Sequence, residues 1–210
     1  MSRTYSRPIV AGIDVGGPRK GFHAVALRHR EVRGTFASRN ACEVADWCKQ
    51  ADATILGVDA PSGWSRSDRA RMAERSLMKS GISCFSTPSE QVARQHSGNF
   101  YAWMLNGVEL YAALGNQFRL FNGRNAEWRP LVFETFPQAI ACALAGTIVS
   151  ARDKRTVRRA LLEKSGLCSD TLTNIDWIDA ALCALMADRF GHGGYRQHGD
   201  AVEGYIVVPD

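Results

Sequence analysis

Short apolar runs alternate with amphipathic segments along the chain, which is the pattern of an α/β protein. The apolar run over 8–15 ends in Gly16-Gly17-Pro18, a strong turn signal, so we expect a buried strand there. Alternating segments over 21–28 and 31–38 follow after short connections and predict two more strands. Short connections favour antiparallel pairing, so these three strands should form a meander.

The rest of the chain alternates helical patterns with two further buried runs. Asn40 can cap a helix that runs to about Gln50, and a strand over 54–59 follows it. A strand reached through a helix pairs in parallel, so this fourth strand should lie beside the first. We also expect a fifth strand over 131–136 and helices over 67–79, 101–114, 137–145, 154–164 and 175–190. The stretches 82–99 and 191–200 are expected to be loops, and 204–208 a short edge strand.

This order predicts an α/β fold with a mixed five-stranded sheet and helices on both faces. The expected strand order is 3-2-1-4-5, with strand 2 antiparallel to the rest. Residues 1–7 are expected to be a flexible tail, and 8–210 a single domain with a loop and helical insertion at about 62–125. The 210 residues are 45% apolar and 22% charged, so one domain can bury a sufficient core.

Charge and cysteine content exclude several classes of protein. The formal charge of +5 permits a polyanionic partner, although solubility alone explains a charge of this size. The six cysteines lack zinc-knuckle spacing, so we expect reduced thiols rather than disulfides or a zinc site. No stretch approaches 18 apolar residues, and the N-terminus lacks an apolar signal core. A cytoplasmic protein without a membrane partner is expected.

Acidic residues lie where the predicted parallel strands end. Asp14 is near the end of the first strand, Asp59 ends the fourth, and Glu134 is near the end of the fifth. The carboxyl ends of parallel neighbours open at one sheet edge, where such sheets bind ligands. Asp176 and Asp179 share one face of the last helix, whose remaining residues are nearly all apolar. An acid on such a buried helix needs a partner.

Each acid also has a structural interpretation. Asp14 and Asp59 could form Asx turns before their Gly and Pro neighbours, and Glu134 could point outward from its strand. Asp176 could stabilise the helix dipole. Asp179 is harder to explain in this way because its helix is so apolar, and the occurrence of Asp14, Asp59, Glu134 and Asp179 at one edge favours a common site. Clustered carboxylates repel one another, and Mg²⁺ or Mn²⁺ relieves that repulsion. Two such ions can clamp the attacking and leaving oxygens of a phosphoryl transfer.

These residues resemble the domain-of-unknown-function 429 (DUF429) family, described as predicted nucleases with a ribonuclease H-like fold. The resemblance runs from residue 9 to about 192 and rests on a set of segments in order. They are Gly12-Ile13-Asp14-Val15-Gly16-Gly17, Val58-Asp59-Ala60-Pro61, Gly81-Ile82-Ser83-Cys84-Phe85, Phe133-Glu134-Thr135-Phe136-Pro137 and Asp176-Trp177-Ile178-Asp179-Ala180-Ala181.

The resemblance implies the fold derived above and metal-dependent phosphodiester chemistry. In ribonuclease H itself the second acid lies on the helix after the third strand. Here that helix carries Glu43 and Asp46, which we expect to be solvated, so Glu134 would have to substitute. Lys154 matches a lysine position of the family pattern and is our candidate for a contact to the transition state or a phosphate.

Cations cluster in two segments that could flank the site. Residues 152–159 include Arg155 and Arg158, and residues 64–75 include Arg71 and Arg75. Together with Lys20, these four arginines are candidate phosphate contacts, although a charge run is also typical of a solvated helix face. The five histidines show no metal-ligand spacing.

The sequence therefore predicts a nuclease or phosphodiesterase that depends on Mg²⁺ or Mn²⁺ and acts on nucleic acid. The expected metal ligands are Asp14, Asp59, Glu134, Asp176 and Asp179, and the expected catalytic residues are Asp14, Asp59, Glu134, Asp179 and Lys154. The alternatives are an actin-like or sugar-kinase-like nucleotide-binding phosphotransferase, a class that also opens with Asp-Xaa-Gly-Gly, and a non-catalytic nucleic-acid-binding module. The choice of RNA or DNA, the number of metals and the oligomeric state, a dimer included, stay open.

Overall fold

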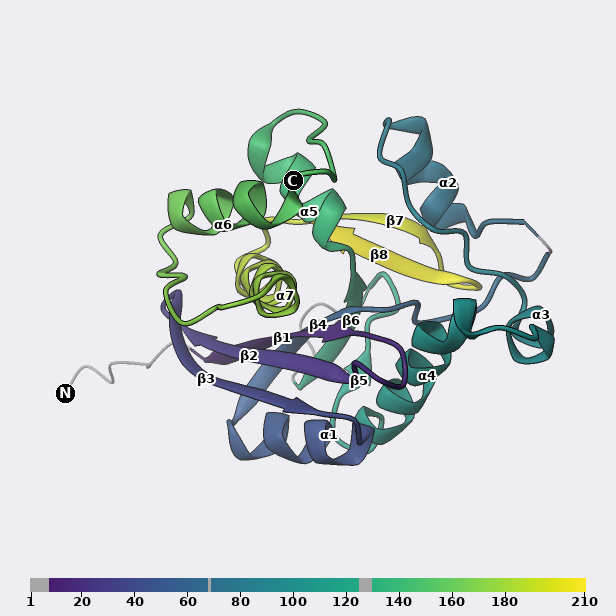
Figure 1. Ribbon diagram of the computed structural model, residues 1–210, viewed down its shortest axis with the longest axis horizontal. Helices are drawn as coiled ribbons and strands as arrows, with labels where there is room; N and C mark the ends of the chain where they lie inside the picture. The colour runs from purple at the N-terminus through teal and green to yellow at the C-terminus, as the bar shows by residue number, and fades with distance from the viewer. Residues whose placement is uncertain (1–7, 68, 125–129) are drawn as a thin grey trace.

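A computed structural model describes residues 8–67, 69–124 and 130–210 (Figure 1). The predicted tail over 1–7 lies outside this part of the chain. The predicted meander is formed by β1 (Ile9–Val15), β2 (Phe22–Arg28) and β3 (Glu31–Ser38), with β2 antiparallel to both neighbours. The Asn40 side chain accepts a hydrogen bond from the N–H of Cys42 and caps α1 (Ala41–Gln50). This helix leads to β4 (Ala53–Asp59), which pairs in parallel with β1.

The segment between β4 and β6 contains α2 (Met72–Lys79), α3 (Glu90–Gln95), the 3-10 turn η1 (Asn99–Tyr101), α4 (Ala102–Leu114) and the short β5 (Arg119–Leu120). The helix predicted from Ser67 begins only at Met72, and residue 68 lies outside the described part of the chain. The Ser65 hydroxyl lies 2.5 and 2.6 Å from the carbonyl oxygens of Ser67 and Arg69, and its proton can be donated to either one. The predicted loop over 82–99 contains α3, because Ser89 accepts a hydrogen bond from the N–H of Val92 as an N-cap.

The remaining elements are β6 (Leu131–Thr135), α5 (Pro137–Ala145), α6 (Lys154–Lys164), α7 (Ile175–Gly191), β7 (Arg196–Asp200) and β8 (Gly204–Val208). Within the described residues the sheet has eight strands in the order β3-β2-β1-β4-β6-β8-β7, with β5 beside β6. The predicted 3-2-1-4-5 order is therefore confirmed, since β6 is the predicted fifth strand. The sheet is nevertheless larger than the five strands we expected.

Two predictions about the C-terminal part were wrong. The predicted loop over 191–200 contains β7, and β8 is not an edge strand, since it pairs with β6 in parallel and with β7 in antiparallel orientation. The polar sequence of β7 carries no strand pattern of its own. The Asp200 carboxylate accepts hydrogen bonds from the N–H groups of Val202 and Glu203, and this turn brings β7 back onto β8.

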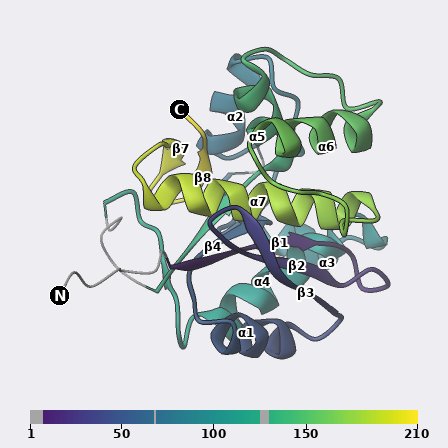
Figure 2. The same ribbon diagram turned by 90° about the vertical axis from the view of Figure 1, so that its left-hand side faces the viewer.

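Helices cover both faces of the sheet, as predicted (Figures 1 and 2). Helix α7 crosses one face, where it packs on β1, β2 and β4, and α5 and α6 contact its other side. Helices α1 and α4 cover the opposite face of the same strands. In Figure 1 the β7-β8 hairpin lies on the far side of α7 from the meander, so the twisted sheet wraps around that helix. The mixed sheet with a leading meander and helices on both faces is therefore the arrangement that the sequence predicts.

None of the helices in 8–67, 69–124 and 130–210 is long and apolar enough to cross a bilayer.

Candidate metal centre

Two aspartates meet at the carboxyl ends of the central strands. In the parallel register of β1 and β4, Asp14 lies directly opposite Asp59. Residues opposite each other in a sheet project from the same face. Gly12 and Gly57, two residues earlier in each strand, lie against α7, so the two aspartates also project toward the α7 face.

Helix α7 approaches these strands closely enough to bring two further acids to the same edge. A Cβ atom on Gly12 would overlap the backbone of Ala180 and Ala184, and one on Gly57 would lie 2.6 Å from the carbonyl oxygen of Cys183. The helix begins at the strands' carboxyl ends, where the Asn174 side chain accepts a hydrogen bond from the N–H of Trp177 as its N-cap.

The two acids of α7 lie in its first turns and face the strand aspartates. Asp176 and Asp179 are 9% and 6% exposed, and Asp14 is 6% exposed. Asp59 retains partial exposure to solvent. The charges of Asp14 and Asp179 both act on Asp59. We call this set of residues, Asp14, Asp59, Asp176 and Asp179, the aspartate cluster.

Basic side chains neutralise part of the aspartate cluster. The Lys20 ammonium forms an ion pair with Asp176, and its Nζ lies 3.7 Å from Oδ2 of Asp14. The buried Arg158 guanidinium donates to Oδ1 of Asp179 at 2.5 Å and to Oε1 of Gln138 at 2.9 Å. The pKa values of Asp14 and Asp179 are raised by burial, and the charge of the exposed Lys154, at the start of α6, opposes that rise.

Burial and the repulsion between neighbouring carboxylates raise the pKa of Asp14, Asp59 and Asp179. Burial, opposed by Lys20 and reinforced by Asp179 and Asp176, raises the pKa of Asp14 to about 7. Burial and the charge of Asp14 raise the pKa of Asp59 well above its ordinary range. Burial likewise raises the pKa of Asp179, although Arg158 opposes the shift. A cluster with this much unrelieved negative charge favours either protons or a cation.

Sequence reasoning did not identify His23 as part of this site. His23 lies opposite Asp14 in the β1-β2 register, so it borders the aspartate cluster. Ligand atoms of Asp14, His23 and Asp176 lie within 4.8 Å of one another. Burial lowers the pKa of His23, although the charge of Asp176 opposes the shift. The observation that places His23 at the site is its pairing with Asp14 across the β1-β2 hairpin, and residue spacing along the chain does not show this pairing.

Glu134 does not join the aspartate cluster. It pairs with Val58 rather than Asp59, and this offset of one residue turns its side chain to the opposite face of the sheet. There its carboxylate accepts hydrogen bonds from the backbone N–H and hydroxyl of Ser62 at 2.7 and 2.9 Å. Arg71 donates to both oxygens, at 2.9 and 2.5 Å. The expectation that Glu134 replaces the second ribonuclease H acid was therefore wrong, although Glu43 and Asp46 are exposed as predicted.

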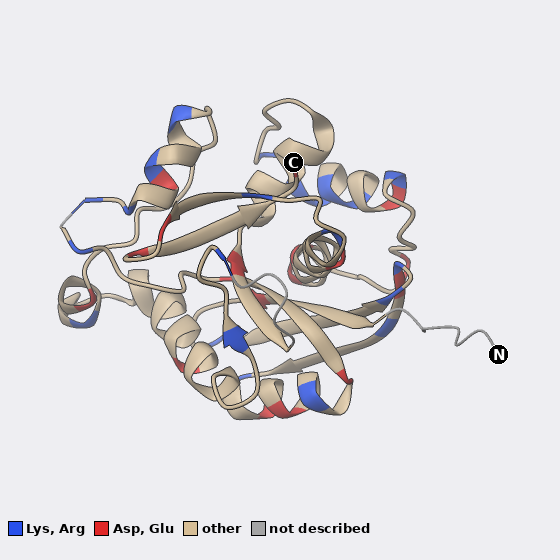
Figure 3. Ribbon diagram, turned by 180° about the vertical axis from the view of Figure 1, so that it is seen from behind, with Lys and Arg blue, Asp and Glu red and all other residues tan. Residues whose placement is uncertain are grey.

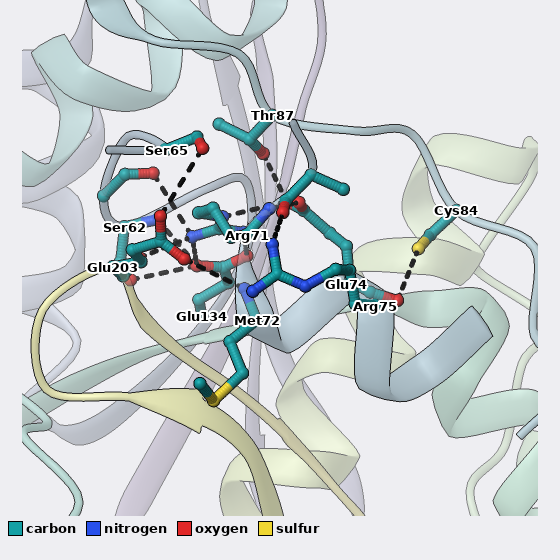
Figure 4. Close-up of polar contacts among 12 residues, drawn as sticks. Ser62, Ser65, Arg71, Met72, Glu74, Arg75, Cys84, Thr87, Glu134 and Glu203 are labelled. Atoms are coloured by element: carbon teal, nitrogen blue, oxygen red, sulfur yellow. Dashed lines mark hydrogen bonds and ion pairs between the residues drawn. The ribbon is translucent and has the colours of Figure 1, made fainter. Parts of the chain in front are cut away.

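Arg71 is the centre of a second polar cluster on that opposite face (Figure 4). It is fully buried, and its Nε donates to Oε1 of Glu74 at 2.8 Å. Glu74 also accepts from the Thr87 hydroxyl at 2.5 Å. Glu203 accepts from the backbone N–H groups of Arg66 and Met72 at 2.8 and 3.0 Å. We call this set, Arg71, Glu74, Glu134 and Glu203, the Arg71 cluster.

The cations predicted to contact phosphates divide into two groups. Arg71 and Arg158 are buried in ion pairs, so their expected role as direct phosphate contacts was wrong. Lys20 and Arg155 keep exposed surface, and Arg155 donates to the carbonyl of Thr173 at 2.7 Å. Arg75 is exposed but donates to the Ala70 carbonyl beside the Arg71 cluster.

The aspartate cluster has the donor chemistry that a divalent cation requires. Oδ2 of Asp14 is buried and, among the described residues, has no hydrogen-bond partner. A buried carboxylate oxygen without a partner is costly, and a bound cation would remove that cost. Carboxylate oxygens are also the ligands that Mg²⁺ and Mn²⁺ prefer. The residues present therefore fit such an ion.

Two of the solved structures that are similar to this chain share little sequence with it. The Thermus thermophilus RuvC structure has a TM-score of 0.46 and 17% identity, over 88% of this chain and 96% of that one. The T. thermophilus RuvC in complex with Holliday junction substrate has a TM-score of 0.45 and 17% identity, over 89% and 97%. No curated protein matches the sequence. The family model "Protein of unknown function (DUF429)" matches residues 12–203, a range that includes every member of the aspartate cluster, and the chain therefore belongs to the DUF429 family.

Proposed function

We propose that this protein is a nuclease that depends on a divalent cation and hydrolyses phosphodiester bonds in nucleic acid. The observation that carries the proposal is the convergence of four aspartates from β1, β4 and α7 at one sheet edge. Structural roles do not account for this arrangement, because Asp14 keeps a buried oxygen without a hydrogen-bond partner. Clustered acids that serve only the fold would be paired instead.

Asp14, Asp59, Asp176 and Asp179 are the proposed ligands, and Mg²⁺ or Mn²⁺ the proposed cofactor. A bound cation would supply Lewis acidity that activates a water for in-line attack and neutralises charge on the phosphate oxygens. Asp14 and Asp59 lie on neighbouring central strands, and hydrogen bonds of the sheet fix their separation. Strand-borne ligands of this kind are held more rigidly than ligands on loops.

Two basic residues form ion pairs with the aspartates, and we propose a different role for each. Arg158 fixes Asp179 through a buried hydrogen bond and is itself held by Gln138, so we assign it as a positioning residue. Lys20 pairs with Asp176 and Asp14, while about half of its side chain is exposed. It can therefore leave the acids when a cation binds and turn toward a phosphate.

A nucleic-acid substrate is proposed because further cations border the same edge. Lys154 and Arg155 are exposed at the start of α6, a helix that packs on α7 (Figure 3). The charge of Lys154 acts on Asp14 and Asp179, which places that ammonium within electrostatic reach of the acids. An acidic centre that borders exposed cations matches a phosphodiester whose neighbouring phosphates also need binding. Lys154 is our candidate for stabilising the transition state.

The proposal is tested by incubating the purified protein with labelled RNA, single-stranded DNA, duplex DNA and branched DNA in Mn²⁺ or Mg²⁺. We expect cleavage of at least one substrate, abolished by EDTA. Asp14→Asn and Asp59→Asn should each lower the rate by about 1,000-fold, since loss of a metal ligand removes several kcal/mol of transition-state stabilisation.

The matched control is Asp46→Asn, which changes an exposed acid on α1 and should leave the rate unchanged. Cleavage that persists in both Asp14→Asn and Asp59→Asn would indicate a contaminating nuclease and contradict the proposal. Absence of cleavage, together with a rise in thermal stability on adding ATP, would instead support the nucleotide-dependent phosphotransferase. Binding of nucleic acid without cleavage in either metal would support the non-catalytic module.

A further inference from the structure

His23 is a second side chain at the aspartate cluster with a buried polar atom, Nδ1, that has no hydrogen-bond partner among the described residues. We propose that His23 is a nitrogen ligand of the metal site, so that the site binds Mn²⁺ in preference to Mg²⁺. The inference rests on the proposed function, because it concerns the same cation, and it names a ligand and a metal preference that the four aspartates do not imply.

Two neighbouring residues of the site each have a buried polar atom that makes no hydrogen bond within the described residues. Nδ1 of His23 and Oδ2 of Asp14 are both buried, and neither has a hydrogen-bond partner in the described part of the chain. Asp14 is 94% buried by surface area, since only 6% of it is exposed. Ligand atoms of Asp14, His23 and Asp176 all lie within 4.8 Å of one another. One divalent cation could bind all three groups, in place of the Lys20 ammonium that pairs with Asp176 and lies near Asp14.

The fold holds the imidazole in place from two sides. The antiparallel register sets His23 directly opposite Asp14, so the hairpin fixes the separation of these two residues. The ring of Trp177, beside Asp176 on α7, meets the His23 ring edge to face, with centroids 4.6 Å apart and an interplanar angle of 82°. An ordinary buried histidine is oriented by hydrogen bonds from its ring nitrogens. Here aromatic packing and strand pairing orient the ring instead, which leaves Nδ1 free of a hydrogen bond.

A nitrogen ligand changes which cations the site prefers. Mg²⁺ binds oxygen ligands and retains water, whereas imidazole suits first-row transition metals. Asp14, Asp176 and His23 form a mixed set of two carboxylates and one imidazole. Mn²⁺ accepts carboxylates as Mg²⁺ does and also accepts imidazole, so the mixed set should favour Mn²⁺.

The experiment measures Mn²⁺ and Mg²⁺ binding to the full chain by calorimetry and records pulsed EPR spectra of bound Mn²⁺. We expect nitrogen hyperfine coupling in the wild-type spectrum and its loss in His23→Asn. The ratio of Mn²⁺ to Mg²⁺ affinity should fall about tenfold in that variant, as ligand-sphere changes commonly lower metal affinity by this factor or more. His23→Phe keeps a ring against Trp177 and should give the same two results.

The matched control is His29→Asn, which changes an exposed histidine in the β2-β3 turn. Its nitrogen coupling and affinity ratio should equal those of the wild type. Mn²⁺ that binds without nitrogen coupling, or with an affinity ratio that His23→Asn and His23→Phe leave unchanged, would overturn the role of His23 and leave the nuclease proposal intact. Absence of Mn²⁺ binding to the wild type would overturn both. The wild-type spectrum reports nitrogen coordination by itself, so the test does not depend on how well a variant folds.

Discussion

The Arg71 cluster and the aspartate cluster lie on opposite faces of the same sheet edge, and they differ in how many hydrogen bonds their buried charges make. In the Arg71 cluster, Glu134 accepts four hydrogen bonds and Arg71 donates to two carboxylates and two backbone carbonyls. In the aspartate cluster, Oδ2 of Asp14 makes no hydrogen bond within the described residues, and its ion pair with Lys20 is 3.7 Å long. Buried charges whose hydrogen-bonding atoms all have partners can be stable parts of a fold, whereas buried charges that lack partners favour binding of a ligand. The number of partners, more than the number of acids, distinguishes the structural cluster from the candidate metal centre.

The largest expected effect on stability comes from breaking the Arg71 cluster. Glu134→Ala leaves the fully buried Arg71 without its bidentate partner, and an uncompensated buried charge costs about 3–5 kcal/mol. We expect urea denaturation to show a loss of this size. Arg94→Ala, which breaks an exposed ion pair with Glu90, should cost less than about 1 kcal/mol and serves as the control. A small loss for Glu134→Ala would mean that the Arg71 cluster contributes little to the fold.

The aspartate cluster, in contrast to the Arg71 cluster, should destabilise the fold when its carboxyl groups are ionised and no divalent cation is present. Asp14 has a folded-state pKa of about 7 and an ordinary value of 3.8, so the unfolded chain releases this proton first as pH rises. The free energy of unfolding should therefore fall between about pH 4 and pH 7, by about 1 kcal/mol or more. Asp14→Asn should reduce this fall, and Mn²⁺ should restore stability near pH 7. A profile that Asp14→Asn leaves unchanged would contradict the raised pKa.

The smallest expected effect concerns the cation already present in the aspartate cluster. Lys20→Gln removes the ammonium that pairs with Asp176 and lies near Asp14. An added divalent cation would then face less competition, so calorimetry should show an increase in Mn²⁺ affinity of about fivefold, as expected for a partly exposed charge pair of about 1 kcal/mol. Arg19→Gln, at the neighbouring exposed position, should leave the affinity unchanged. A decrease in affinity for Lys20→Gln would indicate that Lys20 organises the acids rather than competing with a metal.

The sequence predicted the aspartates correctly as neighbours because their positions follow from strand ends. A buried run that stops at a turn locates Asp14 and Asp59 at one edge once parallel pairing is inferred. Asp179 was found because an acid on an apolar helix demands a partner. The central order of the sheet followed from short and long connections in the same way.

Features that depend on register or on a tertiary partner could not be predicted. Glu134 lies one residue away from the position beside Asp59 that we expected. Because it pairs with Val58 instead, its side chain projects from the other face of the sheet. His23 required the hairpin register, and β7 required β8 as a partner for its polar sequence. Arg71 was placed among phosphate contacts because the charge of an arginine is visible in a sequence, whereas its burial is not.

The contact between Gly12 and α7 has a consequence for how the protein is made. The first strand can pair with its neighbours soon after synthesis, but Asp176 and Asp179 arrive only with the last long helix. Domains are synthesised from the N-terminus, and contacts between distant segments form late. A nascent chain therefore holds two of its four aspartates for most of translation and cannot assemble the complete centre.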